Sequence, residues 1–494
     1  MFNMKKFGGY LSRLRKNSDM TQSELADKLN LTRQAVSRYE TGDSFPDISI
    51  LVIIADIFGV TLNDIINSGE PTSGEKLILG NIADGNDDVI AENISDIVNL
   101  APLLKPRVLT KLSYGCLLYT SLQNITSGVN YATLDDLIVR AAAQEESGTF
   151  FKDNPPPVFV DEIQKAPELF PQIKMIVDRN HKKGQFFMCG SQQFQMMKGV
   201  SESLSGRIGL VTLLGFSLRE KYNVKNDTPF LPTDAYFEER KKQLADISYD
   251  DVWNSIHRGS MPELYENPEF DWQMFYGAYV RTYIERDVRD LSEIGDTVKF
   301  TRFMVATAAS TGQLINLASL ARDVGISQPT AERWLSILVA SNIVYLLKPY
   351  SNNITKRAIK TPKLYFLDTG LAAYLTRWNT VEVLKNGAMA GAFFESFVIS
   401  EIIKSYYNKG IVEPPLYFFR DKDMNEIDLL IEDGGVLHPL EMKKHADPQK
   451  KDMDAFGLLD KIPGIVRGSG GVICLYDNLV TLKGNDRVIP VKYL

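Results

Sequence analysis

The sequence predicts a multidomain protein of mixed α and α/β class, in which an all-α head precedes α/β domains. Its 494 residues are too many for one hydrophobic core, so about two to four domains are expected. Apolar residues recur at helical spacing through the first forty positions. In residues 157–163 (PVFVDEI), four apolar residues are followed by two adjacent carboxylates. This pattern is typical of a buried parallel strand.

Composition places the chain among ordinary globular proteins, with 44% apolar and 24% charged residues. The first sixteen residues are polar and basic, which argues against a signal peptide. The most apolar window, residues 48–58, is too short to span a bilayer. The three cysteines and four histidines are scattered, so no disulfide frame or zinc site is expected. These features predict a cytoplasmic protein without a membrane partner.

Charge is unevenly distributed around a net value of −7. Residues 1–40 carry eight Lys and Arg against four acids, whereas the next seventy residues carry eleven acids and three bases. A basic head on an acidic body is a reason to expect a nucleic-acid surface at the start of the chain.

Two short helices joined by a tight turn are predicted within this basic head. The first begins after Thr21, because Glu24 follows at the spacing of a capping box. Thr32 caps the second helix, and Gly42 with Pro46 ends it. The outward face of this second helix carries Arg, Gln and Ser side chains, which can contact guanine edges, adenine edges and phosphates. Such a helix suits the major groove of DNA.

Residues 7–67 closely resemble the Cro/repressor-type helix-turn-helix of XRE-family regulators, in the segments TQSELA, LTRQAVSRYETG and PD that begin at 21, 31 and 46. The resemblance implies that double-stranded DNA is the partner. A small helical bundle that binds protein is the alternative. The residues expected to contact DNA are Gln22, Thr32, Arg33, Gln34, Ser37 and Arg38.

Residues 68–128 are interpreted as an acidic helical extension and a junction. The segment 114–123 (YGCLLYTSLQ) interrupts the helical patterns before it, and a different protein begins at about residue 129. Two explanations stay open: a natural fusion whose ATPase-like part was degraded, or a joining artefact between two genes.

The carboxylates that end the apolar run at 157–163 suit a nucleotide site. Asp161 would hold Mg²⁺ and Glu162 would polarise the attacking water. The strand at 185–192 ends in Gly-Ser-Gln, which places a polar side chain beside them, and Arg207 could neutralise phosphate charge. Such a site also needs a glycine-rich loop with Gly-Lys, yet no Gly-Lys dipeptide occurs in the sequence.

Residues 129–480 resemble bacterial and archaeal AAA-type ATPases that carry a C-terminal nuclease-like domain. The resemblance implies that Asp161 and Glu162 are Walker B residues, that Ser191 or Gln192 is the phosphate sensor, and that Arg207 is an arginine finger. ATP and Mg²⁺ are the cofactors it implies. Because the family's P-loop, expected before Tyr131, is absent, we predict a truncated P-loop-NTPase-like domain that does not hydrolyse ATP.

Residues 313–349 hold a second pair of helices, at 317–324 and 328–338, followed by a strand at 343–347 that reads as a wing. This pattern predicts a winged helix. A packing or oligomerisation role and a DNA-contacting role are equally compatible with it.

A β-hairpin is predicted near the end of the chain, with strands at 426–431 and 437–443 and a turn at 434–435. It would bring Asp428 near Glu441, with Lys443 on the same face, and the helix at 392–404 would add Glu395. This arrangement resembles the PD-(D/E)xK nuclease core, which implies that the acids bind Mg²⁺ and the lysine orients water. A salt-bridged remnant without catalysis is the alternative.

The expected domains are residues 1–67, 68–128, 129–225, 226–350 and 351–494, the last with an α/β restriction-nuclease-like fold. The predicted function is a sequence-specific DNA-binding regulator of transcription, and a homo-oligomer is left open. An ATP-dependent AAA-family enzyme of nucleic-acid metabolism or defence is the alternative.

Overall fold

The computed structural model describes residues 4–18, 20–29, 31–41, 50, 54, 57–58, 129–180, 183–190, 204, 207–208, 212–226, 228–283, 296–351, 361–411, 413–421 and 423–494. The chain divides into two compact units, Met1–Glu92 with Tyr350–Lys360, and Asn93–Pro349 with Thr361–Leu494. The expected extension at 68–128 lies outside the described residues, and so do the expected sensor Ser191 and its alternative Gln192.

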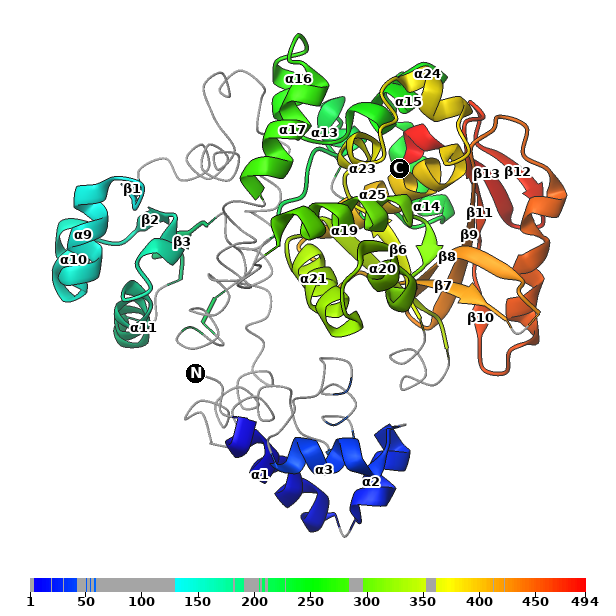
Figure 1. Ribbon diagram of the computed structural model, residues 1–494. Helices are drawn as coiled ribbons and strands as arrows, with labels where there is room; N and C mark the ends of the chain where they lie inside the picture. The colour runs from blue at the N-terminus through cyan, green and yellow to red at the C-terminus, as the bar shows by residue number, and fades with distance from the viewer. Residues whose placement is uncertain are drawn as a thin grey trace. The chain divides into compact units, whose positions relative to one another are not determined.

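The first unit contains the helices α1 (Met4–Asn17), α2 (Gln22–Leu29) and α3 (Arg33–Thr41), drawn in blue in Figure 1. Thr21 and Glu24 form the predicted capping box, because the Glu24 carboxylate accepts from the Thr21 amide at 2.7 Å and the Thr21 hydroxyl accepts from the Glu24 amide at 3.2 Å. The apolar stripes of the helices form one core from Phe7, Leu11, Leu25, Ala26, Leu29, Val36 and Ile54. The predicted all-α head is therefore confirmed.

An α/β segment follows from residue 130. Its strands β1 (Asn130–Thr133), β2 (Val158–Asp161) and β3 (Phe186–Met188) pair in parallel in that order. The helices that connect and follow them are α9 (Leu137–Glu145), α10 (Ser147–Asp153), the 3-10 turn η3 (Ile163–Lys165) and α11 (Leu169–Asn180). Every residue of β2 is buried. Because β2 is the middle strand, its carboxyl end lies between those of its neighbours, as parallel pairing requires.

The C-terminal part of the second unit is built on a mixed sheet with the strand order β12-β13-β11-β9-β8-β7-β5-β6-β4, and β10 pairs with β9 (Figure 1). The strands are β4 (Gln313–Leu314), β5 (Val344–Pro349), β6 (Lys363–Phe366), β7 (Leu416–Arg420), β8 (Glu426–Asp433), β9 (Val436–Lys443), β10 (Val466–Arg467), β11 (Gly471–Cys474), β12 (Val480–Lys483) and β13 (Asp486–Pro490).

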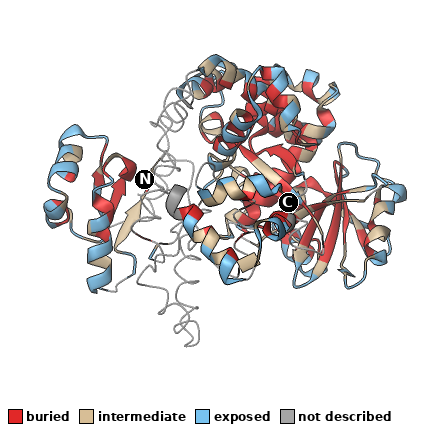
Figure 2. Cartoon of the chain, turned by 60° about the horizontal axis from the view of Figure 1, so that its bottom comes forward, coloured by how far each residue is buried: buried red, intermediate tan, exposed pale blue. Residues whose placement is uncertain are grey.

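The helices of this part are α13 (Leu218–Lys221), α14 (Asp234–Lys241), α15 (Tyr249–Arg258), α16 (Glu263–Glu266), α17 (Trp272–Tyr283), α19 (Thr297–Ala309), α20 (Leu317–Val324), α21 (Gln328–Ala340), α23 (Thr369–Leu375), α24 (Val381–Asn386), α25 (Ala390–Tyr407), and the 3-10 segments η5 (Lys450–Lys461) and η6 (Val491–Tyr493). Most of α25 is buried, and it packs against β6 and β9. Figure 2 shows the buried residues gathered in the sheet and in the helices that face it.

One hydrophobic core runs through this part, from Leu218 to Leu494. The strands β5 and β6, which lie on either side of residue 350, pair antiparallel over residues 344–347 and 363–366. The sheet and the core are thus continuous across that position. Within this arrangement α19, β4, α20, α21, β5 and β6 follow one another, and β4 and β5 both pair with β6.

The predicted hairpin near the end of the chain is present as β8 and β9, which pair antiparallel. Gly434 and Gly435 form its turn with φ values of 54° and 84°. This left-handed region is one that glycine enters without a steric penalty, which explains why the sequence turns there.

Candidate functional site

The exposed face of α3 carries the residues predicted to contact DNA. Arg33, Gln34 and Arg38 are exposed, and Ser37 is half-buried beside them. Thr32 precedes the helix and caps it, because its hydroxyl accepts from the Ala35 amide at 3.3 Å. The opposite side of the helix places Val36 in the core. The helix therefore presents a row of side chains with hydrogen-bond donors and acceptors to solvent.

A buried ion pair fixes the position of α3 in the head. The Arg15 guanidinium donates to both carboxylate oxygens of Glu40, at 2.6 Å and 3.0 Å, and also to the Met20 carbonyl oxygen at 2.6 Å. Gln22 donates to Glu40 at 2.9 Å, so this predicted DNA-contacting residue uses one N–H to tie α2 to the end of α3. Burial alone would raise the pKa of Glu40, but these hydrogen bonds outweigh it and hold the pKa below its ordinary value.

Asp161 ends β2 and is tied to both neighbouring strands. One of its carboxylate oxygens accepts from Tyr131 at 3.1 Å and Thr133 at 3.2 Å, and the other accepts from the Cys189 thiol at 2.6 Å. Burial and the adjacent carboxylate raise the pKa of Cys189, which keeps it a protonated donor. Asp161 itself is only 7% exposed.

Glu162 follows in a left-handed conformation, with φ of 56°. Its carboxylate accepts from Gln164 at 2.7 Å and lies 4.0 Å from the Lys165 ammonium. The structure thus brings Asp161 and Glu162 together at the end of β2, as the sequence predicts. Arg207, the expected arginine finger, forms an ion pair with Asp178 on α11, with the closest N–O distance 2.5 Å.

The C-terminal hairpin and α25 bring the predicted nuclease-like residues together. The Asp428 carboxylate on β8 accepts from the main-chain amide of Met442 on β9 at 3.0 Å. On β9 the Lys443 ammonium donates to Glu441 at 2.8 Å. Glu395 projects from α25 toward the same place, where it is bound by residues of β6. We call Glu395, Glu426, Asp428 and Glu441 the carboxylate cluster.

Lys363 on β6 lies within this cluster and was missed by the sequence analysis. Its ammonium is 2.5 Å from Glu426, 3.0 Å from Glu395 and 3.9 Å from Asp428. The Tyr365 hydroxyl, from the same strand, donates to Glu395 at 2.5 Å. The available signal was a lysine directly before the apolar run 364–367 (LYFL), because a lysine that is buried with such a strand needs acidic partners.

The electrostatics of the cluster follow from burial and like charge. Burial, with the nearby charge of Asp428, raises the pKa of Glu395 to about 7 and that of Glu441 to about 8. Burial alone would lower the pKa of Lys363, but the surrounding carboxylates outweigh it and hold that pKa above its ordinary value. Within the described residues, no group of three or more His, Cys, Asp or Glu side chains is arranged to hold a metal ion.

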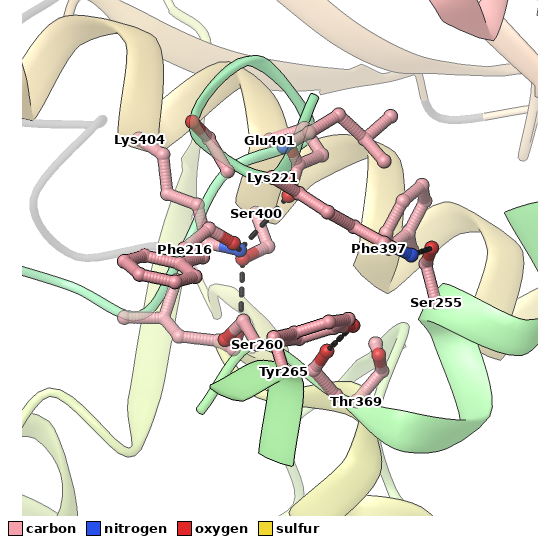
Figure 3. Close-up of a pocket in the computed structure, with 14 residues that line it drawn as sticks. Phe216, Lys221, Ser255, Ser260, Tyr265, Thr369, Phe397, Ser400, Glu401 and Lys404 are labelled. Atoms are coloured by element: carbon pink, nitrogen blue, oxygen red, sulfur yellow. Dashed lines mark hydrogen bonds and ion pairs between the residues drawn. The ribbon is translucent and has the colours of Figure 1, made fainter. Parts of the chain in front are cut away.

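A small pocket lies elsewhere in the C-terminal core, where residues of the segments 216–221, 255–265 and 367–369 meet α25 (Figure 3). The Glu401 and Lys404 side chains form a buried ion pair at 2.9 Å, and Glu401 also accepts from the Leu218 amide at 2.6 Å. Lys221 donates to Ser255 at 2.6 Å, and burial lowers the pKa of this lysine. These charged groups are thus engaged with partners of the chain, and they bind α13 to α15 and α25.

Comparison with protein-family models divides the chain into matched segments. Residues 11–65 match a helix-turn-helix model and residues 115–222 match an AAA domain model. Residues 249–382 and 390–494 match two domains of unknown function, DUF8612 and DUF4143. The chain therefore carries a helix-turn-helix domain of the kind found in transcriptional regulators, an AAA-type domain and these two C-terminal domains.

Several curated relatives match parts of the chain. An uncharacterized protein of Mycobacterium tuberculosis is 29% identical over 59% of this chain, which spans 59% of that relative's length. An uncharacterized HTH-type transcriptional regulator of Bacillus subtilis, YqaE, is 41% identical over 14% of this chain and 59% of its own length. The HTH-type transcriptional activator BcrR of Enterococcus faecalis is 34% identical over 15% of this chain and 33% of its own length.

One solved structure was also found, Bacillus thuringiensis PlcR in complex with the peptide PapR7 and DNA. It is 15% identical over 68% of this chain and 94% of that chain, with a TM-score of 0.14, too low to indicate a shared overall fold. Among the described residues, no helix combines the length and apolar character that crossing a membrane would require.

Proposed function

We propose that this chain is a sequence-specific transcriptional regulator that binds double-stranded DNA through α3. The observation that carries the proposal is the exposed row of Arg33, Gln34 and Arg38 on a helix whose other face is anchored in the core. Arginine and glutamine can each form paired hydrogen bonds with a base edge, to guanine and adenine respectively. Both the helix-turn-helix match and the named regulators among the relatives support this assignment.

The roles of the other predicted contacts follow from their positions. Thr32 begins the exposed row and Ser37 lies half-buried beside Arg38, and the short hydroxyl side chains of both residues suit phosphate contacts. Gln22 begins α2, and its bond to Glu40 ties the start of α2 to the end of α3. We infer that Gln22 positions α3 and also reaches the DNA backbone.

The test uses the full chain and duplexes selected by it from a random library. Arg33→Ala and Gln34→Ala should each weaken binding to the selected duplex by about 1–3 kcal/mol in a fluorescence-anisotropy titration. Arg179→Ala is the matched control, because Arg179 is an exposed helical arginine of the second unit. Equal losses for selected and scrambled duplexes in the α3 variants would contradict base reading.

We further propose that the AAA-type domain does not hydrolyse ATP. The absence of any Gly-Lys dipeptide from the sequence supports this, since a P-loop lysine and its neighbouring amides bind the phosphates. The contacts of Asp161 give further support. Its two oxygens already accept from Tyr131, Thr133 and Cys189, so a directly bound Mg²⁺ would have to displace these partners.

An ATP-dependent enzyme is the second candidate, favoured by the match of residues 115–222 to an AAA domain. Nucleotide binding distinguishes the regulator from the ATP-dependent enzyme. Saturable MgATP binding that Asp161→Asn abolishes, together with ATP turnover, would support the enzyme. Unchanged thermal stability of the full chain with and without MgATP, and no phosphate release, would support the regulator.

We assign interaction or regulatory roles to the C-terminal domains. The order α19, β4, α20, α21, β5, β6, with β4 and β5 both on β6, supports a winged helix. Its second helix presents Gln328 and Glu332, which bond each other at 3.0 Å, so this face is less suited to DNA than α3. The hairpin with Asp428, Glu441 and Lys443 supports a nuclease-like fold for the tail.

A further inference from the structure

The carboxylate cluster at β6, β8, β9 and α25 already contains a cation supplied by the chain. The Lys363 ammonium lies 2.5 Å from Glu426, 3.0 Å from Glu395 and 3.9 Å from Asp428, and its side chain is 5% exposed. These carboxylates come from α25 and β8. An ammonium enclosed in this way by acidic groups of different elements is fixed in position.

The remaining charged groups around the cluster are also paired. Lys443 is 2.8 Å from Glu441, and Arg420 is 3.6 Å from Glu426. Asp428 accepts from the Met442 amide, which uses one of its oxygens. The Tyr365 hydroxyl donates to the Glu395 oxygen that also binds Lys363. Each acid of the cluster is therefore paired with at least one donor or cation of the chain, supplied by β6, β7 or β9.

The resemblance to PD-(D/E)xK nucleases implies Mg²⁺ at this place, and the residues present do not fit it. Mg²⁺ requires near-octahedral oxygen ligands at about 2.0–2.1 Å and usually keeps several waters. Here the space between Glu395, Glu426 and Asp428 is filled by the Lys363 side chain, which is four methylene groups long and carries the charge at its end. A divalent ion among the same oxygens would face the ammonium at short range, and the two would repel each other.

We propose that Lys363 is the resident cation of the carboxylate cluster and takes the position of a divalent metal, so that the C-terminal domain is assembled without one. The ammonium offsets part of the negative charge of the cluster and crosslinks β6 to β8 and α25. It cannot act as a Lewis acid or generate a metal-bound hydroxide, which are the contributions of a metal ion to phosphodiester hydrolysis. The tail would accordingly serve as a structural or binding domain.

The proposal is tested by Mn²⁺ binding to the full chain, measured by electron paramagnetic resonance of the free ion. Lys363→Met removes the charge while keeping an unbranched side chain, and Lys363→Arg keeps the charge. We expect the unaltered chain and Lys363→Arg to show no Mn²⁺ binding that depends on Asp428. Lys363→Met should bind one Mn²⁺ at least about tenfold more tightly than any Mn²⁺ binding measured for the unaltered chain. Adding Asp428→Asn to Lys363→Met should abolish that gain.

Lys443→Met is the matched control, because Lys443 also pairs with a cluster acid but lies at its rim. It should show no comparable gain in Mn²⁺ binding. Thermal unfolding gives a second measurement. Lys363→Met should lower the melting temperature by roughly 5–15 °C, and Mn²⁺ should restore part of this loss in Lys363→Met only.

Three results would overturn the proposal. The first is saturable micromolar Mn²⁺ binding by the unaltered chain that Asp428→Asn abolishes. The second is an equal gain in Lys443→Met and Lys363→Met. The third is a folded Lys363→Met with no gain. If Lys363→Met does not fold, the comparison of the unaltered chain with Asp428→Asn and Glu395→Gln decides, since Asp428-dependent binding contradicts the proposal and its absence supports it.

Discussion

The buried ion pair between Arg15 and Glu40 leads to a specific prediction for Arg15→Met. The Arg15 side chain is 11% exposed and that of Glu40 is 7% exposed, and their closest atoms are 2.6 Å apart. Methionine keeps an unbranched side chain at position 15 but leaves the buried Glu40 carboxylate with neutral donors, Gln22 and Ser12, and without its cationic partner. Arg15 does not belong to the exposed face of α3, so any loss of DNA binding would act through the fold.

The size of the effect follows from the burial of the pair. Removing one partner of a buried ion pair costs about 3–5 kcal/mol. A helical head of about sixty residues has a total unfolding free energy of roughly 3–9 kcal/mol at about 0.05–0.15 kcal/mol per residue. The variant should therefore lose much of the stability of the head. At about 1.4 kcal/mol per factor of ten, core amides that exchange through opening of the head should exchange about 100-fold faster or more.

Hydrogen exchange with mass spectrometry on the full chain measures this directly. Peptides covering α1, α2 and α3 should lose protection, while peptides from the C-terminal sheet serve as the internal reference. Adding Glu40→Leu to Arg15→Met should recover most of the protection, because an apolar pair can replace a buried ion pair. Protection in Arg15→Met within about threefold of the unaltered chain would refute the reasoning.

Three further predictions concern Glu40, Arg240 and two glycines. The pKa of Glu40 is held below its ordinary value, so Glu40 stabilises the head at any pH above its unfolded-state pKa of about 4.3. This stabilisation is lost as the pH falls through the folded-state pKa. Acid unfolding followed by circular dichroism should therefore show a weaker pH dependence in Glu40→Gln. Arg240, 2% exposed, donates to the main-chain oxygens of residues 492–494, so Arg240→Met should cost about 2–4 kcal/mol in urea unfolding of the C-terminal part; a change below about 0.5 kcal/mol would contradict this role. Gly259 has φ of 85°, and an added Cβ would lie 2.1 Å from the Tyr276 hydroxyl oxygen, so Gly259→Ala should lower the unfolding free energy by about 2–4 kcal/mol. Gly325 has φ of 75° with open space around it, so Gly325→Ala should lower the unfolding free energy by about 1 kcal/mol. Equal losses of stability in the two variants would show that the close approach to Tyr276 is unimportant.

The head was predictable because its signals are local. The capping box at Thr21 and Glu24, the Thr32 cap and the apolar stripes all lie within a few residues of the helices they define. The buried strand that ends at Asp161 was equally clear from its apolar run. The contacts of Asp161 with Tyr131 and Cys189 join residues 30 and 28 positions apart, and neither partner carries a signal that names the other.

In the carboxylate cluster, too, the local contacts were predictable and the long-range contact was not. Glu441 and Lys443 lie on one strand and Asp428 on the next, so a hairpin pattern was sufficient to group them. Lys363 reaches the cluster from β6, which joins the sheet through β5 and β7, and no local pattern predicts that order of strands. The domain limits expected at 225 and 350 remain predictions, and the assignment of DNA, nucleotide and nuclease-like residues awaits the experiments above.

The docking of α13 on α25 bears on how the protein is made. The Leu218 amide meets the Glu401 carboxylate 183 positions later, and the Phe230 carbonyl oxygen meets the Tyr406 hydroxyl 176 positions later. During synthesis, the helices that begin at residue 218 must leave the ribosome well before α25 exists to cover their apolar faces. The nascent chain therefore exposes aromatic surface for many seconds at about 5–20 residues per second, and chaperone binding during that interval would protect it from aggregation.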